Sequence, residues 1–428
     1  MAKHKNVILL TIDEMRSDGL NCYGNQNVYT PYANQLAEDG VLFTEAIATA
    51  DLTPVCHASL LTGTYPEKNC IRSPFSYLRG KTWAEYYKQE GYKTAGFVGV
   101  SFLGSKHGFE RGFDHYEEAT EGKRGAERMT SWGADNPFTL GNWWIDEFFQ
   151  WLDDNHEDDF CVWGHYFFVH QGTEAFLLEE GMLDRDKDDS TLFYLNPKIS
   201  LMDKVLLGPL VERLKKWGLY DDCTIILMSD HGANCGEHPV GKSPNGDFYY
   251  PQHVCLYDED IHIPLIIKSP SLPKGKRVDG MVRQIDVLPT ILDAMGIDCS
   301  DNNFDGVSLL PVIEKGHAEG AVNYIEDLYE VRGPGALQGM RTDDFKYWRN
   351  LSGWYEELYD LKADPAEQHN LIAEKLQSDP DFVKKCRSFV NEHLLPKVPF
   401  GEDLQGYKLT QDDQEIIEAR LRSLGYIE

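Results

Sequence analysis

The chain has 428 residues, of which 42% are hydrophobic and 26% are charged. This composition is typical of a globular protein and excludes a disordered or fibrous one. Its 41 basic and 70 acidic residues give a formal net charge of −29. A surface this negative repels nucleic acid, anionic lipid and polyanionic glycans, so we expect neither a nucleic acid nor a membrane as partner.

The N-terminal segment and the cysteines favour a reducing compartment. Residues 1–5 carry positive charge but lead into an apolar run of only six residues, 7–12, which Asp13 ends. This pattern predicts a buried strand and not a signal peptide. The nine cysteines include no CxxC pair, which indicates reduced thiols. We therefore expect a cytoplasmic protein.

Short apolar runs alternate with amphipathic stretches up to about residue 315. In chain order, strands are predicted at 7–12, 93–98, 160–169, 224–228 and 264–267, and helices at 31–37, 82–89, 143–152, 201–217 and 286–295. The run 7–12 shows no alternation, which indicates a strand buried on both faces. Strands that alternate with helices predict an α/β fold with a mostly parallel sheet.

The character of the sequence changes near residue 318. We expect a catalytic α/β domain at 1–317, a small C-terminal α+β subdomain at 318–400, and a linker with a last helix at 401–428. Within the subdomain, the stretches 347–349 and 354–359 are predicted antiparallel strands and 379–392 a helix. Its aromatic residues would serve either a homo-oligomer interface or the closing of the active site.

Acidic and histidine side chains follow two of the predicted strands. Asp13 comes directly after the strand at 7–12, and Asp230 and His231 follow the strand at 224–228. Because the carboxyl ends of strands in an open α/β sheet form the ligand crevice, we expect these residues in one cleft. Two carboxylates and an imidazole suit Mn²⁺, Mg²⁺, Ca²⁺ or Zn²⁺. The alternative is that the acids only cap the next helix.

A third segment, 51–63, has small polar residues before a short apolar helix that Gly63 ends. It contains Thr53, Cys56 and His57. A nucleophile at such a helix N-terminus gains from the positive end of the helix dipole and from free N–H groups, which also stabilise an anionic substrate.

These segments belong to a longer series of motifs in which the chain resembles the sulfatase branch of the alkaline phosphatase superfamily. The resemblance covers nearly the whole chain. It implies an alkaline-phosphatase-like sandwich, with a large, mostly parallel central sheet flanked by helices and a small C-terminal subdomain. The matching stretches are 6–13, 22–24, 30–31, 40–44, 59–66, 229–232, 236–238, 264–267, 286–290, 357–361 and 421–426.

The resemblance leaves open which residue is the nucleophile. Sulfatases carry a cysteine, oxidised to formylglycine, ten residues before the glycine of Leu-Thr-Gly and ten after an upstream phenylalanine. Counting from Gly63 and from Phe43 gives Thr53 both times, and His57 falls where the family motif has its arginine. Cys56 is the alternative, but Leu60 leaves it without the arginine of the maturation motif.

Threonine at this position resembles the phosphodiesterase and lipoteichoic-acid-synthase-like branches, in which a metal-bound alkoxide attacks phosphorus. Metal coordination activates a hydroxyl that is a poor nucleophile by itself. The resemblance therefore implies one divalent cation held by Asp13, Thr53, Asp230 and His231. Glu14 stands where many sulfatases have a second metal-binding aspartate, so it is either a ligand or a helix-capping acid.

The resemblance also nominates residues on the substrate side. Lys242, His170 and His253 are expected in catalysis, and Lys242, His170 and His57 in binding the substrate. His165 and His170 match a family run that often contains an aspartate where this chain has Phe168. A second metal is therefore doubtful, and His165 by itself is typical of a buried strand histidine.

Three functions remain open from the sequence. The leading one is a metal-dependent hydrolase of a small anionic ester, namely a phosphodiester, a phosphonate monoester or a sulfate ester. The second is a true sulfatase in which Cys56 becomes formylglycine. The third is a non-catalytic relative that binds an anion in the same cleft.

Overall fold

The computed structural model describes residues 6–118, 144–170, 192, 194–238, 255–300, 303–329, 335–353 and 355–394, together with the backbone of 241–242 and 248–249. No helix in these ranges is both long enough and apolar enough to span a bilayer.

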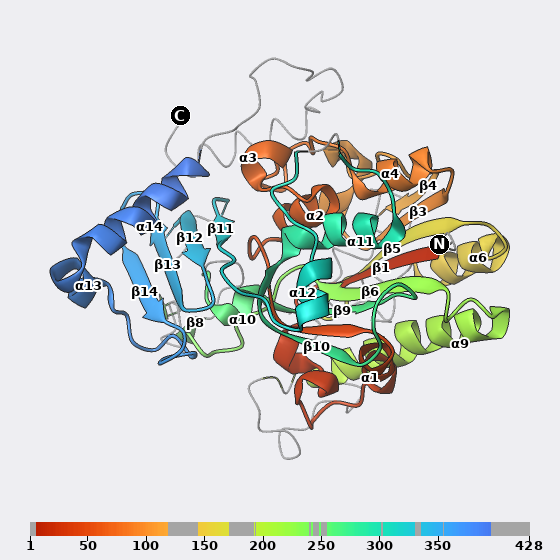
Figure 1. Cartoon of the computed structure of the whole chain (residues 1–428), viewed down its shortest axis with the longest axis horizontal. Coiled ribbons are helices and arrows are strands. Elements are labelled where there is room, and N and C mark those ends of the chain that lie inside the picture. Colours follow the sequence, from red (N-terminus) through yellow and green to blue (C-terminus); the bar gives the residue numbers. More distant parts are fainter. Residues whose placement is uncertain are drawn as a thin grey trace.

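A central sheet of eight strands forms the larger part of the molecule (Figure 1). Its spatial order is β10 (Lys276–Arg283), β2 (Val41–Ile47), β9 (His262–Lys268), β6 (Cys223–Ser229), β1 (Asn6–Ile12), β5 (Phe160–Tyr166), β3 (Lys93–Val98) and β4 (His115–Glu118). Only β9 runs antiparallel to its two neighbours. The strands at the centre are buried along their whole length, as expected for a sheet covered on both faces.

Helices cover both faces of this sheet and enclose two apolar cores (Figure 1). One core lies against α2 (Thr53–Thr62), α4 (Trp83–Gln89), α11 (Val287–Met295) and α12 (Leu310–Lys315). The other lies against α1 (Pro31–Glu38), α6 (Ile145–Asn155), α8 (Asn196–Met202) and α9 (Gly208–Trp217). The expected fold, a mostly parallel sheet between layers of helices, is confirmed.

Two differences between the predicted and observed bounds have a structural explanation. The strand predicted at 160–169 ends at Tyr166, because the chain then forms a turn in which His170 N–H donates to Phe167 O at 3.0 Å. The helix predicted at 201–217 is the second part of a longer run, since α8 passes through a π-helical turn at Asp203–Leu207 into α9.

A second sheet of four antiparallel strands lies beside the first (Figure 1). It consists of β11 (Asn323–Asp327), β12 (Leu337–Arg341), β13 (Phe345–Asn350) and β14 (Glu356–Asp360), accompanied by α13 (Ile372–Ser378) and α14 (Pro380–Glu392). The domain boundaries at 317/318 and 400/401 stay predictions, and residues 401–428 lie outside the described ranges.

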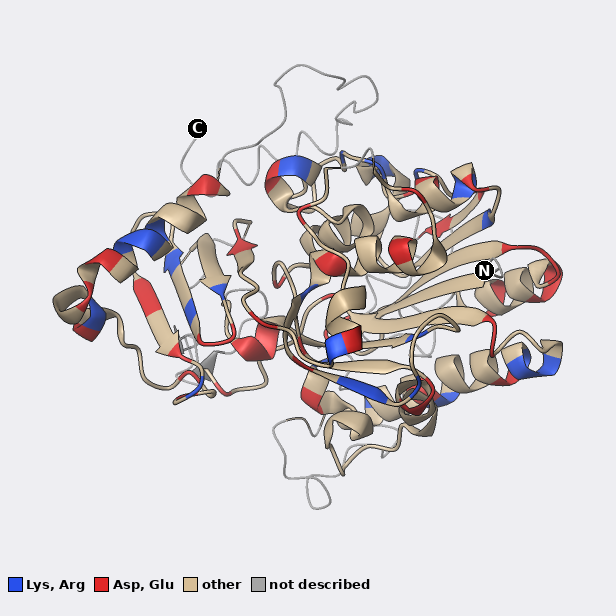
Figure 2. Cartoon of the chain, viewed as in Figure 1, with Lys and Arg blue, Asp and Glu red and all other residues tan. Residues whose placement is uncertain are grey.

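The edge strand β11 is joined to the chain segment that leads into α2. Glu326 N–H donates to Thr49 O at 3.0 Å, and the Asn323 side-chain amide donates to Ala48 O at 2.9 Å. The short helix α10 (Asp258–Ile261) is a second junction, visible as an acidic segment between the two sheets in Figure 2. Asp258 accepts from Arg341 at 3.0 Å and from Lys346 at 2.8 Å. The small sheet therefore supports the segment that leads into α2, at whose first position Thr53 lies.

Candidate active site

Three neighbouring strands of the central sheet end at the same edge. In the parallel register, Thr11 of β1 lies opposite His165 of β5, and Ile12 lies opposite Ser229 of β6. The residues that follow these strands, Asp13 and Asp230, are therefore brought together and are fully buried. This is the arrangement that the strand-end positions predict.

Helix α2 places Thr53 over these carboxylates. Every residue of the helix is buried, and Gly63, with φ +63°, ends it in the left-handed conformation that glycine adopts without strain. Thr53, the first residue, is 7% exposed. Its Oγ1 lies 3.4 Å from Asp13 Oδ2 and 3.2 Å from His231 Nε2. The predicted nucleophile and three predicted ligands thus form one cluster.

His231 presents a lone pair to this cluster. Its Nδ1 lies 2.9 Å from Gly232 O, and because a carbonyl only accepts, Nδ1 carries the proton and Nε2 does not. Burial lowers the pKa of His231 to about 3, so the ring is neutral at pH 7. Gly232 is required here, because a Cβ would lie 2.1 Å from Glu259 O.

The Thr11 hydroxyl joins three rings beneath the nucleophile. It lies 2.9 Å from His57 Nε2, accepts from Trp163 Nε1–H at 3.0 Å, and lies 3.3 Å from His165 Nδ1. His57 Nδ1 donates to Thr53 O at 2.8 Å, so its Nε2 must accept the single Thr11 proton. The remaining lone pair of Thr11 then accepts from His165 Nδ1–H. This accounting fixes the tautomers of both histidines.

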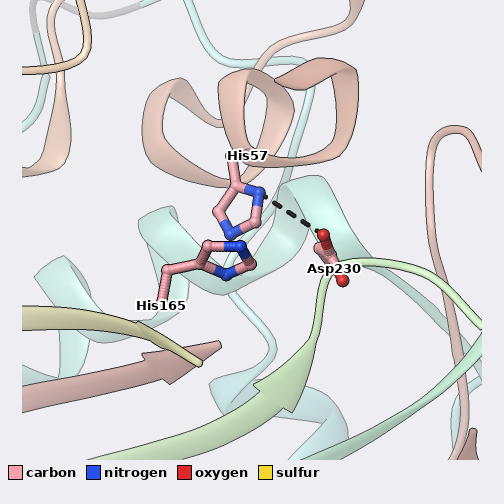
Figure 3. Close-up of side chains that lie close together, drawn as sticks. All are labelled: His57, His165 and Asp230. Carbon is pink, nitrogen blue, oxygen red and sulfur yellow. Dashed lines mark ion pairs between the residues drawn. The ribbon is translucent and has the colours of Figure 1, made fainter. Parts of the chain in front are cut away.

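In Figure 3, His57 descends from α2 toward His165, and Asp230 lies beside it at the end of β6. His57, His165 and Asp230 have side-chain atoms close enough together to suggest a metal site. However, both nitrogens of His57 are already hydrogen-bonded, and its Nδ1, a proton donor, is the atom 3.7 Å from Asp230 Oδ2. This trio is therefore not a cation site in this conformation.

The set Asp13, Asp230 and His231 does fit a divalent cation. Its ligand atoms lie within 4.8 Å of one another. Asp13 Oδ1 and Asp230 Oδ2 are buried and have no hydrogen-bond partner among the described residues, an arrangement that is costly without a counter-charge. Burial and the neighbouring Asp230 raise the pKa of Asp13 well above its ordinary value. A cation supplies the missing partner.

His165 is the remaining buried side chain beside the cluster. Because Thr11 takes its Nδ1–H, its Nε2 lone pair faces Asp13 Oδ2 at 3.3 Å. Burial lowers the pKa of His165 to about 4 and that of His57 to about 3, so both rings are neutral. From the sequence, His165 is expected to be a buried strand histidine, and it is buried. However, its position beside Asp13 makes it part of the site.

The predicted site residues are otherwise placed as follows. His57 is fully buried, so the geometry favours a role in positioning Thr53 over the predicted contact with substrate. His170 Nε2 lies 3.2 Å from Glu14 Oε1. The side chain of Lys242 and the whole of His253 lie outside the described residues.

Cys56 lies one turn further along α2 and faces the apolar core. It is fully buried, and its Sγ donates to Ala50 O at 3.1 Å. Burial raises the pKa of this thiol well above its ordinary value, and the nearby Asp230 adds to the shift. Such a thiol is a poor nucleophile.

The comparisons with known proteins match this architecture. The family model "Sulfatase" matches residues 5–297, and the model "N-sulphoglucosamine sulphohydrolase, C-terminal" matches residues 246–387. An ulvan-active sulfatase of Formosa agariphila is 25% identical over 425 residues, which cover 88% of this chain and 79% of that protein. An N-acetylglucosamine-6-O-sulfatase of Bacteroides thetaiotaomicron is 23% identical, covering 86% and 83%.

Solved structures share the fold. The phosphonate monoester hydrolase of Agrobacterium radiobacter superposes with a TM-score of 0.69 at 21% identity, covering 91% of this chain and 96% of that one. A protein solved with its substrate, D-glucosamine-2-N,6-O-disulfate, gives a TM-score of 0.71 at 20% identity, with 91% and 98% covered. With the first family model matching more than half of its length, the chain belongs to the sulfatase family and is an ester hydrolase of the class expected from its motifs.

Proposed function

We propose that this protein is a metal-dependent hydrolase of a small anionic ester in which Thr53 is the nucleophile. The observation that carries the proposal is the position of Thr53 Oγ1, which lies 3.4 Å from Asp13 Oδ2 and 3.2 Å from His231 Nε2 at the start of α2. A divalent cation held by Asp13, Asp230, His231 and the Thr53 hydroxyl supplies the positive charge that activates this hydroxyl.

The chain's own residues account for the remaining steps. Thr53 Oγ1 forms a bond to the phosphorus or sulfur atom as the bond from that atom to the leaving oxygen breaks. The Thr53 proton passes to Asp13 Oδ2, which lies 3.4 Å from the hydroxyl, and a histidine, His170 or His253, protonates the leaving oxygen. Water then attacks the threonine ester, which releases the acid and restores the hydroxyl. Lys242 is proposed to bind the non-bridging oxygens.

A threonine nucleophile also favours one class of ester as the substrate. The formylglycine of a sulfatase reacts as an aldehyde hydrate, which has two hydroxyl groups. After one of them has taken up the sulfate, the other can expel it by re-forming the aldehyde. Thr53 has one hydroxyl, so release requires water to attack the central atom. We therefore propose a phosphodiester or a phosphonate monoester as the preferred substrate, with sulfate monoesters as the family alternative.

The test is a panel of nitrophenyl phosphodiesters, phosphonates and sulfates assayed with the wild type, Thr53→Ala and Cys56→Ala. Loss of a catalytic nucleophile lowers kcat by orders of magnitude, so we expect Thr53→Ala to lose activity by about 100-fold or more. Cys56→Ala should retain it, and the intact mass should show unmodified Cys56. Full activity in Thr53→Ala, or a mass about 18 Da low that maps to Cys56, would return the protein to the formylglycine enzymes.

A further inference from the structure

The small sheet contacts the chain on both sides of helix α2. The entry segment, residues 48–52, leads into the helix, and the exit segment, residues 63–65, leads from it into the short helix α3 (Pro66–Asn69). β11 is the edge strand of the small sheet that faces these segments (Figure 1). Side chains of β11 can therefore act on the helix that carries Thr53 from a distant part of the sequence.

One side chain of β11, Asn323, binds both segments. It is fully buried. Its Nδ2 donates to Ala48 O at 2.9 Å and to Ile47 O at 3.5 Å, and because carbonyl oxygens only accept, the orientation of the amide is fixed. Its Oδ1 accepts from the Tyr65 hydroxyl at 3.1 Å. A single amide group thus joins the chain before α2 to the chain after it.

The Tyr65 hydroxyl is held in this arrangement. Burial raises the pKa of Tyr65 to about 12, so the hydroxyl keeps its proton. Its oxygen accepts from Tyr324 N–H at 3.2 Å, which directs the proton at Asn323. A polar group that loses its partner in a buried position costs stability or moves to find another one. Loss of the Asn323 amide would therefore free the entry and exit segments together.

Further contacts hold the same two segments. On the entry side, Glu326 N–H donates to Thr49 O at 3.0 Å. On the exit side, Arg72 Nη1 lies 3.2 Å from Glu326 Oε2, and its Nη2 donates to His393 O at 2.6 Å. His393 Nδ1 in turn lies 2.5 Å from Glu67 Oε1 of α3. β11 and the end of α14 thus fix the separation between the two segments.

The placement of α2 decides the geometry of the nucleophile. Thr53 is the first residue of the helix, and its Oγ1 lies 3.4 Å from Asp13 Oδ2 and 3.2 Å from His231 Nε2. Both partners follow strands of the central sheet, so a shift of α2 against that sheet changes both distances. A displacement of a catalytic group by about 1 Å can lower the rate about 100-fold.

We propose that Asn323 is a positioning residue for the reaction: it fixes α2 at both ends and so holds Thr53 against Asp13 and His231. The inference rests on the proposed function only in that the nucleophile lies on α2. It gives the small sheet a part in catalysis that needs no contact with the substrate. Because Asn323 is fully buried, its loss should lower kcat and kcat/KM by the same factor.

The test measures kcat and KM of Asn323→Leu and Tyr65→Phe with the best ester. Asn323→Leu removes the links to both segments, so kcat should fall by about 10- to 100-fold with KM within about threefold of the wild type. Tyr65→Phe removes one link and should lower kcat by about 3- to 10-fold. The matched controls Asn350→Leu and Tyr347→Phe change buried residues of β13, which β12 separates from β11. Both should keep kcat within about twofold.

Hydrogen exchange measured by mass spectrometry shows whether α2 is the part that is released. Peptides from residues 48–65 should exchange faster in Asn323→Leu than in the wild type, while peptides from β1 and β6 should exchange at the wild-type rate. In Asn350→Leu the exchange of residues 48–65 should not change. Circular dichroism establishes that each variant is folded at the assay temperature.

Three results overturn the inference. They are an unchanged kcat in folded Asn323→Leu, a higher KM with kcat retained, and a lower kcat without faster exchange in residues 48–65. If Asn323→Leu does not fold, Tyr65→Phe decides, and a kcat equal to that of Tyr347→Phe refutes the positioning role.

Thr53→Ala separates this inference from the proposed function. Full activity in Thr53→Ala together with a low kcat in Asn323→Leu would refute Thr53 as the nucleophile, while the positioning of α2 would stand. An inactive Thr53→Ala together with a fully active Asn323→Leu would leave the Thr53 mechanism intact and refute the positioning role.

Discussion

Replacing Thr11 by valine should destabilise the protein far more than replacing it by serine. Valine matches threonine in shape but lacks the hydroxyl that joins His57, Trp163 and His165. Thr11 is fully buried, so the three partner groups would lose their hydrogen bonds without gaining water. Each such group costs about 1–3 kcal/mol, and because the three share one hub the costs are not additive; we expect a total of about 3–6 kcal/mol.

Serine keeps the hydroxyl and removes one buried methyl group, at a cost of about 1 kcal/mol. The free energy of unfolding should be measured by urea denaturation with circular dichroism, in EDTA so that cation binding does not contribute. Thr224→Val is the control, because Thr224 is equally buried and its hydroxyl makes its close hydrogen bond with Ser269 Oγ, at 2.8 Å. Its loss should cost about 1 kcal/mol.

The result that refutes this reasoning is Thr11→Val as stable as Thr11→Ser at an unchanged denaturant slope. In that case the hydroxyl would not hold the three rings, and the tautomers assigned to His57 and His165 would lose their basis. A loss of stability in Thr11→Val with unchanged kcat in the remaining folded protein would separate the network's structural role from any role in positioning Thr53.

Two further predictions concern pH and metal. Burial raises the pKa of Glu326 from 4.5 to about 7. The contribution of this carboxyl group to stability is therefore present below pH 4.5 and is lost as the pH rises through 7. Relative to Glu326→Gln, the wild type should lose up to about 3 kcal/mol of unfolding free energy between about pH 5 and 8. Parallel pH profiles for the two proteins in urea denaturation would contradict this. EDTA should abolish activity and lower the Tm, since a cation at 100 times its Kd adds about 2.7 kcal/mol. Asp230→Asn should melt at the same temperature with and without EDTA, and a Tm of this variant that still falls with EDTA would place the cation elsewhere.

The central strands could be predicted from the sequence because they are continuous apolar runs. β3 has the predicted bounds, and β1, β6 and β9 are each longer by one to three residues. Three strands toward the edges of the central sheet were missed: β10, its neighbour β2, and the opposite edge strand β4. β10 reads KRVDGMVR and has exposed and half-exposed positions, and β2 and β10 shift register where they pair. Polar and charged residues interrupt the apolar runs of these strands, so neither a continuous run nor a strict alternation marks them in the sequence.

The same limit applies to the site. The strand-end positions of Asp13, Asp230 and His231 predict that these residues meet, and the spacing of the family motif nominates Thr53. Thr11, Trp163 and His165 could not be predicted, because inside a buried strand each is typical of a core residue. The parallel register sets Thr11 opposite His165, and α2 places His57 over Thr11. Only this three-dimensional arrangement shows that the residues form one network.

The pairing of Glu14 with His170 was also beyond the sequence. The left-handed turn at Glu14 depends on the contact between Met15 and Ser229, which are 214 residues apart. No local pattern encodes that contact. Long-range geometry therefore places the Glu14 carboxylate beside His170.

Mass spectrometry of the enzyme, quenched in acid during turnover of its best ester, would identify the nucleophile directly. We expect a transient phosphoryl, phosphonyl or sulfuryl adduct on the peptide that contains Thr53, and no such adduct in Thr53→Ala. An adduct on Cys56, or full turnover with no adduct on α2 at any quench time, would contradict the assignment of Thr53 as the nucleophile.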